Sequence, residues 1–476
     1  MIRRIYFGWL FLLLGIAPAI AADAPIALHP QNPYYLLFRG KPTILITSTE
    51  HYGAVLNGDF DYVPYLDELA ARKLNLTRTF SGVYRELPGT FNITDNTLAP
   101  KTKDKFVCPW ARSDTPGARD GGNKFDLTMF NPAYFERLKN FIGEAGKRGI
   151  VVELVLLCTT YDDKLWAASP QNAVNNVNGI GKFDRTELYT LKHPEMVEVH
   201  DALVRKIAGE LKEFDNLYYE ICNEPYFGGV ADDWQAHISA TLSDAEKDFP
   251  ARHLIAQNIA NGSKKIDKPD PNVSIFNYHY ATPPDTIEQN FRLNKVFSDD
   301  ETGFRGKEDV YYRTEAWEFL IAGGAICDNL DYSFTPAHPD GTLLDFKSPG
   351  GGGAELRNQL RILRDFMYGL DFIHMKPMNG IVKGGSATAP LAGAPARSGV
   401  TVRAFGQEGR IYAIYIRGGT QAELVLRLPN GKYHSEWLNT KTGKPDKSKE
   451  IDGGADVRIS SPPYTEDIAL RIRADG

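Results

Sequence analysis

Short apolar, β-branched runs alternate with amphipathic helical patterns from residue 43 to residue 370. Runs that are apolar on both faces and alternate with helices are typical of a parallel sheet. Eight runs have this character: Thr43–Thr49, Leu74–Phe80, Ile150–Cys158, Leu217–Cys222, His253–Gln257, Ser274–Tyr280, Lys295–Asp299 and Gly324–Tyr332. The helical patterns are Tyr62–Lys73, Pro132–Arg148, Glu195–Phe214, Asp232–Asp248, Asp309–Ala322 and Glu355–Leu370. Eight such units predict an α/β fold, a (β/α)8 TIM barrel over residues 22–378.

The pattern changes after residue 378. Residues 379–399 are rich in Gly, Ala, Pro and Ser, which indicates a linker or a long loop. Six short alternating runs follow without a helix: Val400–Phe405, Arg410–Ile416, Ala422–Leu428, Tyr433–Asn439, Val457–Ser460 and Ile468–Ile472. They predict a small antiparallel β-sandwich as an accessory domain over residues 400–476.

The first residues of the chain have the pattern of a targeting segment. Arg3 and Arg4 precede a mostly apolar run, Ile5–Pro18, and Ala19 and Ala21 are small residues at the positions that a signal peptidase reads. Because the run is short for a membrane span, we expect residues 1–21 to be a cleaved signal peptide and the protein to be secreted or periplasmic. An uncleaved membrane anchor is the alternative.

Composition excludes several classes of protein. Of the 476 residues, 24% are charged and 42% hydrophobic, which describes a folded globular chain. The net charge of −6 gives no basic surface for nucleic acid. The sequence contains no C-x-x-C pair, no H-E-x-x-H helix and no G-x-S-x-G elbow, so neither a zinc hydrolase nor a serine hydrolase is predicted.

Two glutamates directly follow apolar strands of the predicted barrel, where TIM barrels place their active sites. Glu224 lies between Asn223 and Pro225, after the fourth strand, and Glu301 follows the seventh. Two carboxylates facing one cleft are what glycoside hydrolysis requires, since one protonates the leaving oxygen and the other attacks carbon or activates water. Their like charges and partial burial are expected to raise the pKa of the acid.

Each glutamate has an alternative reading. Glu224 also fits a carboxylate that caps the turn after its strand. Three other acidic residues lie near Glu301, and strand alternation predicts that Asp299 points away from Asp300, while Glu315 falls on the following helix.

Asn223-Glu224-Pro225 resembles the Asn-Glu-Pro signature of clan A retaining glycoside hydrolases, the group that contains the cellulase-like family. The resemblance implies that Glu224 is the acid/base, that Asn223 binds the 2-hydroxyl of the sugar and that Glu301 is the nucleophile. The whole chain is similar to secreted bacterial glycosyl hydrolases with a C-terminal β-domain.

Further strand-end residues carry parts of the same resemblance. His279 and Tyr280 are similar to a His-x-Tyr feature whose aromatic hydroxyl steadies the nucleophile, although here no residue separates the two. Arg78 resembles the arginine that closes the second strand, and an interior ion pair is its alternative role. The third strand lacks the usual histidine, and the eighth lacks the usual tryptophan, so the resemblance does not identify the sugar.

Four more residues are candidates for substrate contact. His51 and Glu50 follow the first strand, where a subsite wall is expected, and structural hydrogen bonds are the alternative for both. Tyr161 and Tyr332 are candidates for stacking on a sugar face, with core packing as the alternative. For His279, a core position is likewise the alternative.

The sequence therefore predicts a retaining glycoside hydrolase that acts on an oligo- or polysaccharide. The two-carboxylate chemistry uses no metal or cofactor, and we expect none. The alternative is a non-catalytic carbohydrate-binding protein on a degenerate barrel. The distance between the carboxyl groups discriminates, because retaining enzymes hold them about 5–5.5 Å apart and inverting enzymes about 6.5–9.5 Å.

Overall fold

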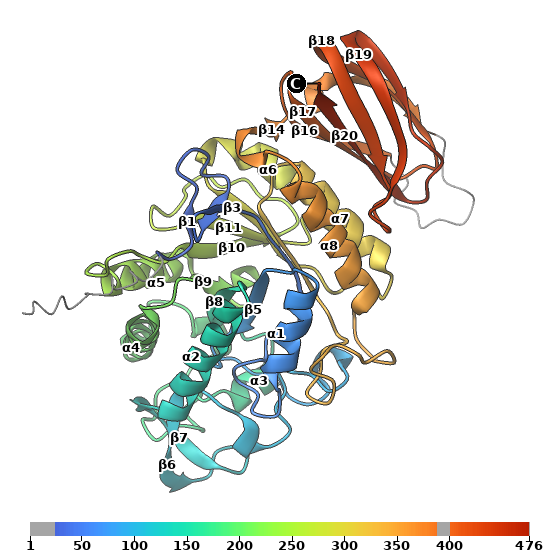
Figure 1. Ribbon diagram of the computed structural model, residues 1–476. Coiled ribbons are helices and arrows are strands. Elements are labelled where there is room, and N and C mark those ends of the chain that lie inside the picture. Colours follow the sequence, from blue (N-terminus) through green and yellow to red (C-terminus); the bar gives the residue numbers. More distant parts are fainter. Residues whose placement is uncertain (1–23, 388–399, 476) are drawn as a thin grey trace, which may run out of the picture.

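The computed structural model describes residues 24–387 and 400–475 (Figure 1). Eight strands form one parallel sheet in the order β4-β13-β12-β11-β10-β9-β8-β5. Since β4 and β5 end this order, the sheet is a nearly closed barrel, and the predicted fold class is confirmed. The bounds are β4 Leu45–Thr49, β5 Leu76–Phe80, β8 Val151–Cys158, β9 Leu217–Asn223, β10 Ile255–Asn261, β11 Ile275–His279, β12 Val296–Glu301 and β13 Ile326–Leu330.

Helices surround the barrel, and the six predicted ones all form. They are α1 Tyr62–Ala71, α2 Pro132–Lys147, α4 Pro194–Leu211, α5 Asp232–Ala245, α7 Asp309–Ile321 and α8 Ala354–Tyr368. α2 shows how the sequence encodes them: the Asn131 side chain accepts a hydrogen bond from the Ala133 amide, and Pro132 occupies the first turn. The short helices α3 (Asp163–Ala168) and α6 (Asp285–Asn290) lie in connecting segments.

Two small sheets flank the barrel. β1 (Ala27–Leu28), β2 (Leu36–Phe38) and β3 (Lys41–Thr43) form an antiparallel sheet before the first barrel strand. β6 (Trp110–Pro116) and β7 (Asn123–Phe130) form a hairpin within the long connection between β5 and α2. The sequence pattern did not predict these pairs, because the strands are short or largely polar.

The C-terminal segment forms a seven-stranded sheet in the order β14-β16-β17-β20-β18-β15, with β19 paired to β18. Its strands are β14 Lys376–Pro377, β15 Val382–Ala387, β16 Thr401–Gln407, β17 Ile411–Arg417, β18 Ala422–Leu438, β19 Pro445–Ser460 and β20 Asp467–Ala474. The expected antiparallel β-domain is confirmed. Two of the predicted runs, before and after residue 430, are joined into the single long strand β18.

The segment 379–399, expected to be a linker or long loop, needs a correction over its first part. Val382–Ala387 is strand β15 and pairs with β18. The glycines of this segment interrupt the alternation of apolar and polar residues, so the sequence pattern did not indicate a strand. As an edge strand, β15 is held by hydrogen bonds to the backbone of its neighbour rather than by its own side chains. Residues 388–399 lie outside the described residues, as does the predicted signal peptide.

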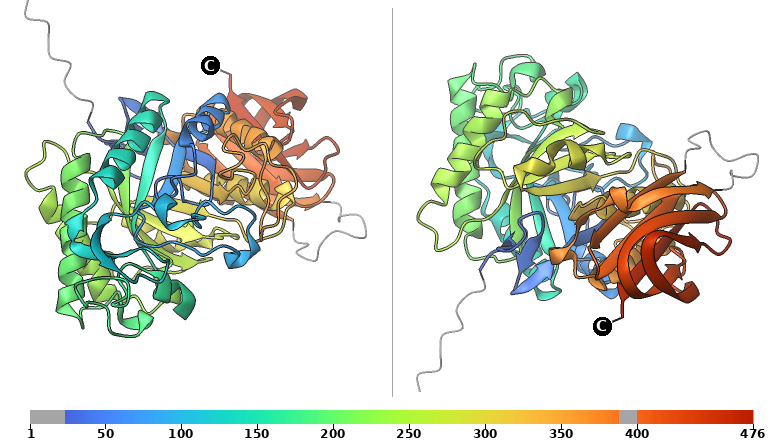
Figure 2. Two further views of the ribbon diagram at one scale, coloured as in Figure 1. Left: turned by 90° about the horizontal axis from the view of Figure 1, so that it is seen from below. Right: turned by 90° about the horizontal axis from the view of Figure 1, so that it is seen from above.

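The sheet lies against α7 on one side of the barrel (Figures 1 and 2). Alternation along β17 explains this packing: Ala413 and Tyr415 join the core of the barrel, whereas Ile414 and Ile416 join the sheet's own core. The ring of Tyr415 stacks on Trp317 of α7 with centroids 5.5 Å apart. The sheet thus shares apolar packing with the barrel.

The four cysteines, Cys108, Cys158, Cys222 and Cys327, are all buried and free. In the described part of the chain, no helix combines the length and hydropathy that crossing a membrane requires. Apolar packing and polar contacts, rather than disulfides, hold this fold together.

Candidate active site

Glu224 stands at the end of a wholly buried strand, where the backbone turns sharply. β9 is buried at every position, and Glu224 follows it with φ 47° and ψ 53°. A residue other than glycine in this left-handed region costs about 1–3 kcal/mol, a cost that clusters at functional sites. Pro225 then opens a short 3-10 turn. The strained turn leaves the largely buried Glu224 side chain lining a cavity.

A β-bulge aims the second carboxylate. The ladder between β11 and β12 shifts register, so that Asp300 is an extra residue in β12. In a regular strand, Asp299 and Glu301 share one face. Here the carboxylates of Asp300 and Glu301 both face Arg78, at 3.6 and 3.2 Å, whereas Asp299 accepts a hydrogen bond from the Ala281 amide. The expectation that Asp299 and Asp300 point apart is confirmed.

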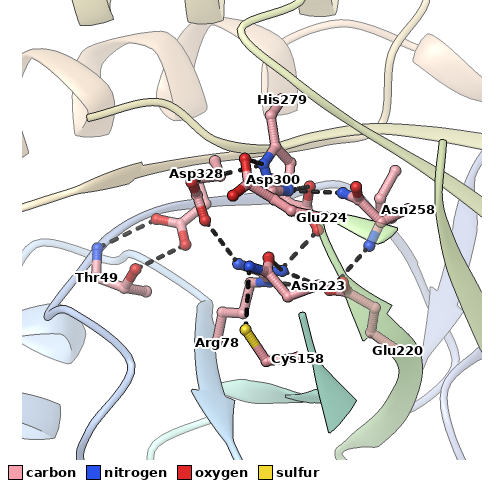
Figure 3. Close-up of polar contacts among 12 residues, drawn as sticks. Thr49, Arg78, Cys158, Glu220, Asn223, Glu224, Asn258, His279, Asp300 and Asp328 are labelled. Atoms are coloured by element: carbon pink, nitrogen blue, oxygen red, sulfur yellow. Dashed lines mark hydrogen bonds and ion pairs between the residues drawn. The ribbon is translucent and has the colours of Figure 1, made fainter. Parts of the chain in front are cut away.

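The carboxylates of Glu224 and Glu301 face each other beside one histidine. One oxygen of each and a ring nitrogen of His279 all lie within 4.8 Å of one another. His279 Nδ1 is 3.3 Å from Glu224 and 3.5 Å from Glu301, and its Nε2 accepts a hydrogen bond from the Asn258 amide at 2.6 Å (Figure 3). With Nε2 accepting, Nδ1 carries the proton and donates toward the pair.

Arg78 holds the site from below, inside the barrel (Figure 3). Its guanidinium donates to Glu220 and to the Asn223 side-chain oxygen, both at 2.7 Å, and to Glu301 at 3.2 Å. Burial, opposed by Arg78 and assisted by Glu153, raises the pKa of Glu220 to about 7. Burial also raises the pKa of Asp300 well above its usual range. The arginine therefore aligns Asn223 and Glu301 from a buried cluster in which burial favours the protonated forms of Glu220 and Asp300.

Burial dominates the electrostatics of the Glu224 and Glu301 carboxyl groups. It raises the pKa of Glu224, while hydrogen bonds, first that from Tyr161, lower it in part. Burial likewise raises the pKa of Glu301, partly offset by His279 and Arg78 and reinforced by Glu224. Burial lowers the pKa of His279 to about 4, so the imidazole is neutral at pH 7.

The two glutamates open into a cavity of about 540 Å³. Six of the predicted catalytic or substrate-binding residues line this cavity: His51, Tyr161, Asn223, Glu224, Tyr280 and Glu301. Tyr161 donates its hydroxyl proton to Glu224 at 2.5 Å and accepts a hydrogen bond from the Asn223 amide at 2.9 Å. Tyr161 is therefore bonded to the proposed acid rather than only packed in the wall.

Four residues that we expected to bind substrate are buried below or beside the cavity and do not line it: Glu50, Arg78, His279 and Tyr332. The Glu50 carboxylate accepts hydrogen bonds from the Gly53 and Ala54 amides, which is the structural alternative. Arg78 has the interior ion pairs that were its alternative. Arg78 and His279 project from β5 and β11 into the barrel interior, whereas Glu50 and Tyr332 follow β4 and β13 and are buried beside the cavity.

Tyr332 and Tyr280 also differ from expectation in their contacts. The Tyr332 ring packs 5.6 Å from that of His51, beneath the surface. Tyr280 lines the cavity with φ 55°, and the guanidinium of Arg305 lies 5.5 Å from its ring centre. In the part of the chain that the structure describes, the Glu301 carboxylate pairs with Arg78 and His279, and no hydrogen bond joins it to the Tyr280 hydroxyl.

The sequence analysis missed several lining residues because they lie in long connections rather than at strand ends. They are Glu86, Phe91, Leu98, Phe227, Phe304 and Arg305, besides Asn261 at the end of β10 and the aromatic residues Tyr52 and Phe80. Glu86 accepts a hydrogen bond from the Asn96 amide at 2.5 Å and lies 3.3 Å from His51. The sequence feature that could have identified Phe227 and Phe304 is their position, because each lies three residues after a predicted catalytic glutamate.

Two groups of described residues have the donor atoms and spacing to hold a metal ion. The first is Glu224, His279 and Glu301 themselves. The second is Glu153, Glu220 and Asp300, inside the barrel. In the second group Arg78 already supplies positive charge at 2.7 Å from Glu220, so the chain itself balances these carboxylates.

No family model and no curated protein matches this sequence. Solved structures are similar to it in fold. A glycoside hydrolase aligns with TM-score 0.60 and 14% identity, over 95% of this chain and 97% of its own. A glycoside hydrolase family 5 protein from Bacteroides vulgatus aligns with TM-score 0.60 and 14% identity, over 94% and 93%. A family 5 mannosidase from Rhizomucor miehei aligns with TM-score 0.50 and 13% identity, over 74% and 100%. The fold of this chain, barrel and C-terminal sheet together, is one found among glycoside hydrolases.

Proposed function

We propose that the protein is a retaining glycoside hydrolase of the clan A type, with Glu301 as nucleophile and Glu224 as acid/base. The observation that carries the proposal is the approach of their carboxylate oxygens to within 4.8 Å at the edge of the cavity. Retaining enzymes hold the two carboxyl groups about 5–5.5 Å apart, whereas inverting enzymes leave room for a water at about 6.5–9.5 Å. The short distance supports direct attack by Glu301.

The reaction has two displacements. In the first, a Glu301 oxygen forms a bond to the anomeric carbon as the bond from that carbon to the leaving oxygen breaks, and the leaving oxygen takes the proton of Glu224. In the second, water attacks the anomeric carbon while Glu224 accepts a proton from it, and the bond to Glu301 breaks. Both glutamates thereby return to their starting protonation states.

The surrounding residues prepare the pair for these steps. The guanidinium of Arg78, hydrogen-bonded to Glu301, favours its ionised form, while neutral His279 Nδ1 donates toward either carboxylate without adding charge. The raised pKa of Glu224 favours its protonated form, which the first step requires. Asn223, held by Arg78 and Tyr161, is positioned for the 2-hydroxyl of the sugar.

The substrate is proposed to be a glycoside of an oligo- or polysaccharide class, handled without a cofactor. Residues 1–21 are proposed to direct export and to be removed, which would place the mature enzyme outside the cytoplasmic membrane. The segment 400–476 is proposed to buttress the barrel, since its strands β17 and β20 contribute apolar side chains to the barrel core.

Trapping with activated 2-fluoro glycosides tests the proposal. The mature protein is incubated with a panel of such sugars and analysed by intact mass and peptide mapping, with Glu301→Gln as the matched control. A covalent sugar on Glu301, absent in the variant, is the expected result. A label on another carboxylate overturns the assignment of the nucleophile. No label, together with no hydrolysis of any polysaccharide, favours the non-catalytic carbohydrate-binding alternative.

A further inference from the structure

Three phenylalanines with exposed rings line the mouth of the cavity. Phe91, Phe227 and Phe304 are 41%, 56% and 40% exposed and come from three separate connections of the barrel. An exposed phenylalanine ring offers an apolar surface and no hydrogen-bonding group. Single exposed apolar residues need no explanation, but a cluster around a cavity marks a binding surface.

The three rings are joined into one surface through Tyr161. The ring centres of Phe304 and Phe91 are 5.6 Å apart, those of Phe91 and Tyr161 5.9 Å, and those of Tyr161 and Phe227 6.4 Å. The first two pairs meet edge to face, at 88° and 83°. We call Phe91, Tyr161, Phe227 and Phe304 the aromatic rim.

The aromatic rim is continuous with the proposed acid. The Tyr161 hydroxyl donates to Glu224 at 2.5 Å, and Phe227 lies on the 3-10 turn directly after Glu224, with its amide donating to the Glu224 carbonyl at 3.1 Å. The acid of a glycosidase faces the oxygen of the leaving group. The rim therefore lies where the part of the substrate beyond the scissile bond must pass.

Backbone strain at Phe91 is a second, independent observation. Phe91 has φ 53° and ψ 15°, and Asn92 after it has φ 56°. The connection is held in this shape by the Glu86 amide, which donates to the Leu98 carbonyl at 2.8 Å, and by the Thr94 amide, which donates to the Lys347 carbonyl at 2.8 Å. The Phe91 ring packs against other members of the rim and stays 41% exposed, so burial in the core does not account for this strain.

We propose that the leaving-group side of the site is built for an apolar aglycone, an aryl group or an alkyl chain, rather than for a further sugar. The inference rests on the proposed glycosidase function and extends it to the substrate class. A sugar in this place would need hydrogen-bond partners for several hydroxyls, whereas the aromatic rim offers them only the Tyr161 hydroxyl, which is already committed to Glu224 and Asn223. Other polar groups of the lining also have partners: His51 pairs with Glu86, Arg305 pairs with Glu315, and Asn261 accepts a hydrogen bond from the Tyr226 hydroxyl.

The test compares substrates that share a glycone and differ only beyond the scissile oxygen. Methyl, n-octyl and phenyl β-glycosides and the matching disaccharides of glucose, mannose and galactose are assayed by released monosaccharide, with the octyl compounds below their micelle concentration. For the glycone that is accepted, we expect kcat/KM for the octyl or phenyl glycoside to exceed that for the methyl glycoside and the disaccharide by about tenfold or more. Preference for octyl or for phenyl distinguishes a lipid-like from an aromatic aglycone.

Variants of the rim separate this inference from the function itself. Phe227→Ser and Phe304→Ser are expected to lower kcat/KM several-fold more for the octyl or phenyl glycoside than for the methyl glycoside, mainly through KM. Leu344→Ser, at a side chain that is 89% exposed and outside the cavity, serves as the control. Hydrolysis with equal rates for methyl and octyl glycosides, or a disaccharide preference, overturns the inference and leaves the glycosidase standing.

Absence of any hydrolysis overturns the proposed function. In that case, calorimetry measures the binding of the same methyl, octyl and phenyl glycosides to the wild-type protein and so tests the aromatic rim as a ligand site. Tighter binding of the octyl or phenyl compound, lost in Phe227→Ser, supports an apolar ligand site. Equal binding or none overturns it.

Discussion

The hydroxyl of Tyr161 donates to an oxygen of Glu224 at 2.5 Å, while the hydroxyl of Tyr226 lies 3.5 Å from the other oxygen. Both contacts favour the ionised carboxylate and lower its pKa, against the larger effect of burial. Glu224, the proposed acid, thus has a short and a long contact with tyrosine hydroxyls. Removing each hydroxyl in turn therefore gives two matched variants that measure its effect on the pKa of Glu224.

Tyr161→Phe keeps the ring and removes the strong hydrogen bond. The pKa of Glu224 then rises further, Glu224 stays protonated to higher pH, and the basic limb of the kcat/KM–pH profile moves to higher pH. Tyr226→Phe, the matched control, is expected to move the limb less because its contact is longer. The pH–rate profiles of the three proteins measure this, and a basic limb that stays in place or moves to lower pH in Tyr161→Phe contradicts the assignment of Glu224 as acid.

Removal of each glutamate has a distinct kinetic signature. For Glu224→Ala, we expect kcat/KM to fall by about 10²–10⁴-fold with poor leaving groups and much less with a dinitrophenyl glycoside, because an activated leaving group needs no proton. Added azide should restore turnover and give a glycosyl azide of retained configuration, since it attacks the Glu301 intermediate. Nuclear magnetic resonance of the product reports its anomeric configuration.

Glu301→Ala lacks the nucleophile, so azide can only displace the leaving group directly and give the inverted product. The same azide outcome in both variants would argue against the assigned roles.

The strand-end rule led from the sequence to Glu224 and Glu301 because parallel strands of a barrel bring their carboxyl ends to one face. It did not predict how Glu301 is aimed. By alternation Glu301 shares a face with Asp299, and only the bulge at Asp300, a matter of pairing with β11, turns it toward Arg78. Bulges arise from register between strands, which a single sequence does not display.

The same rule overstated substrate contact. Glu50 and His279 stand at or next to strand ends, whereas Arg78 is the central residue of β5. The depth of each side chain depends on how the barrel is filled, and all three are buried. Conversely, Phe91 and Glu86 reach the cavity from a long connection whose course depends on contacts such as that of Thr94 with Lys347. Tertiary contacts of this kind produce no periodic pattern in the amino-acid sequence, so the sequence does not predict them.

Glu50 is expected to make the free energy of unfolding fall as the pH rises from about 4.5 to about 7. Burial raises its pKa to about 7, although hydrogen bonds from Thr97 and the amides of Gly53 and Ala54 lower it in part. Between the unfolded value near 4.5 and about 7 the folded state keeps the proton that the unfolded state has lost, so this group makes stability fall as pH rises through that window. Glu50→Gln removes the contribution, which is up to roughly 3 kcal/mol.

Urea denaturation at pH 5 and pH 7.5 measures the effect. The stability of Glu50→Gln relative to the wild type is expected to be greater at pH 7.5 than at pH 5. Glu408→Gln, at an exposed glutamate, controls for loss of charge. A relative stability of Glu50→Gln that does not change between the two pH values would show that Glu50 ionises at its ordinary pKa.

The last prediction concerns how the C-terminal sheet is held to the barrel. Arg313 on α7 is buried and donates to Asp467 on β20 at 2.8 Å and to Glu466 at 2.6 Å. Asp467 is buried, whereas Glu466 is exposed. Asp467→Ala leaves the buried cation without its buried partner, with only the exposed Glu466 as a counter-ion, and is expected to cost about 3–5 kcal/mol of unfolding free energy. Glu466→Ala, on the same arginine, is expected to cost about 0–1 kcal/mol, because water screens an exposed pair.

Calorimetry with intrinsic fluorescence tests both variants and also the shared core. Since Tyr415 stacks on Trp317 across the contact, the barrel and the sheet are expected to unfold in one transition in the wild type and in Glu466→Ala. In Asp467→Ala that transition moves to lower temperature, and the change in tryptophan fluorescence moves with it. Equal costs for the two variants would mean that the ion pair with Asp467 is as screened as its exposed neighbour, and that apolar packing alone holds the sheet in place.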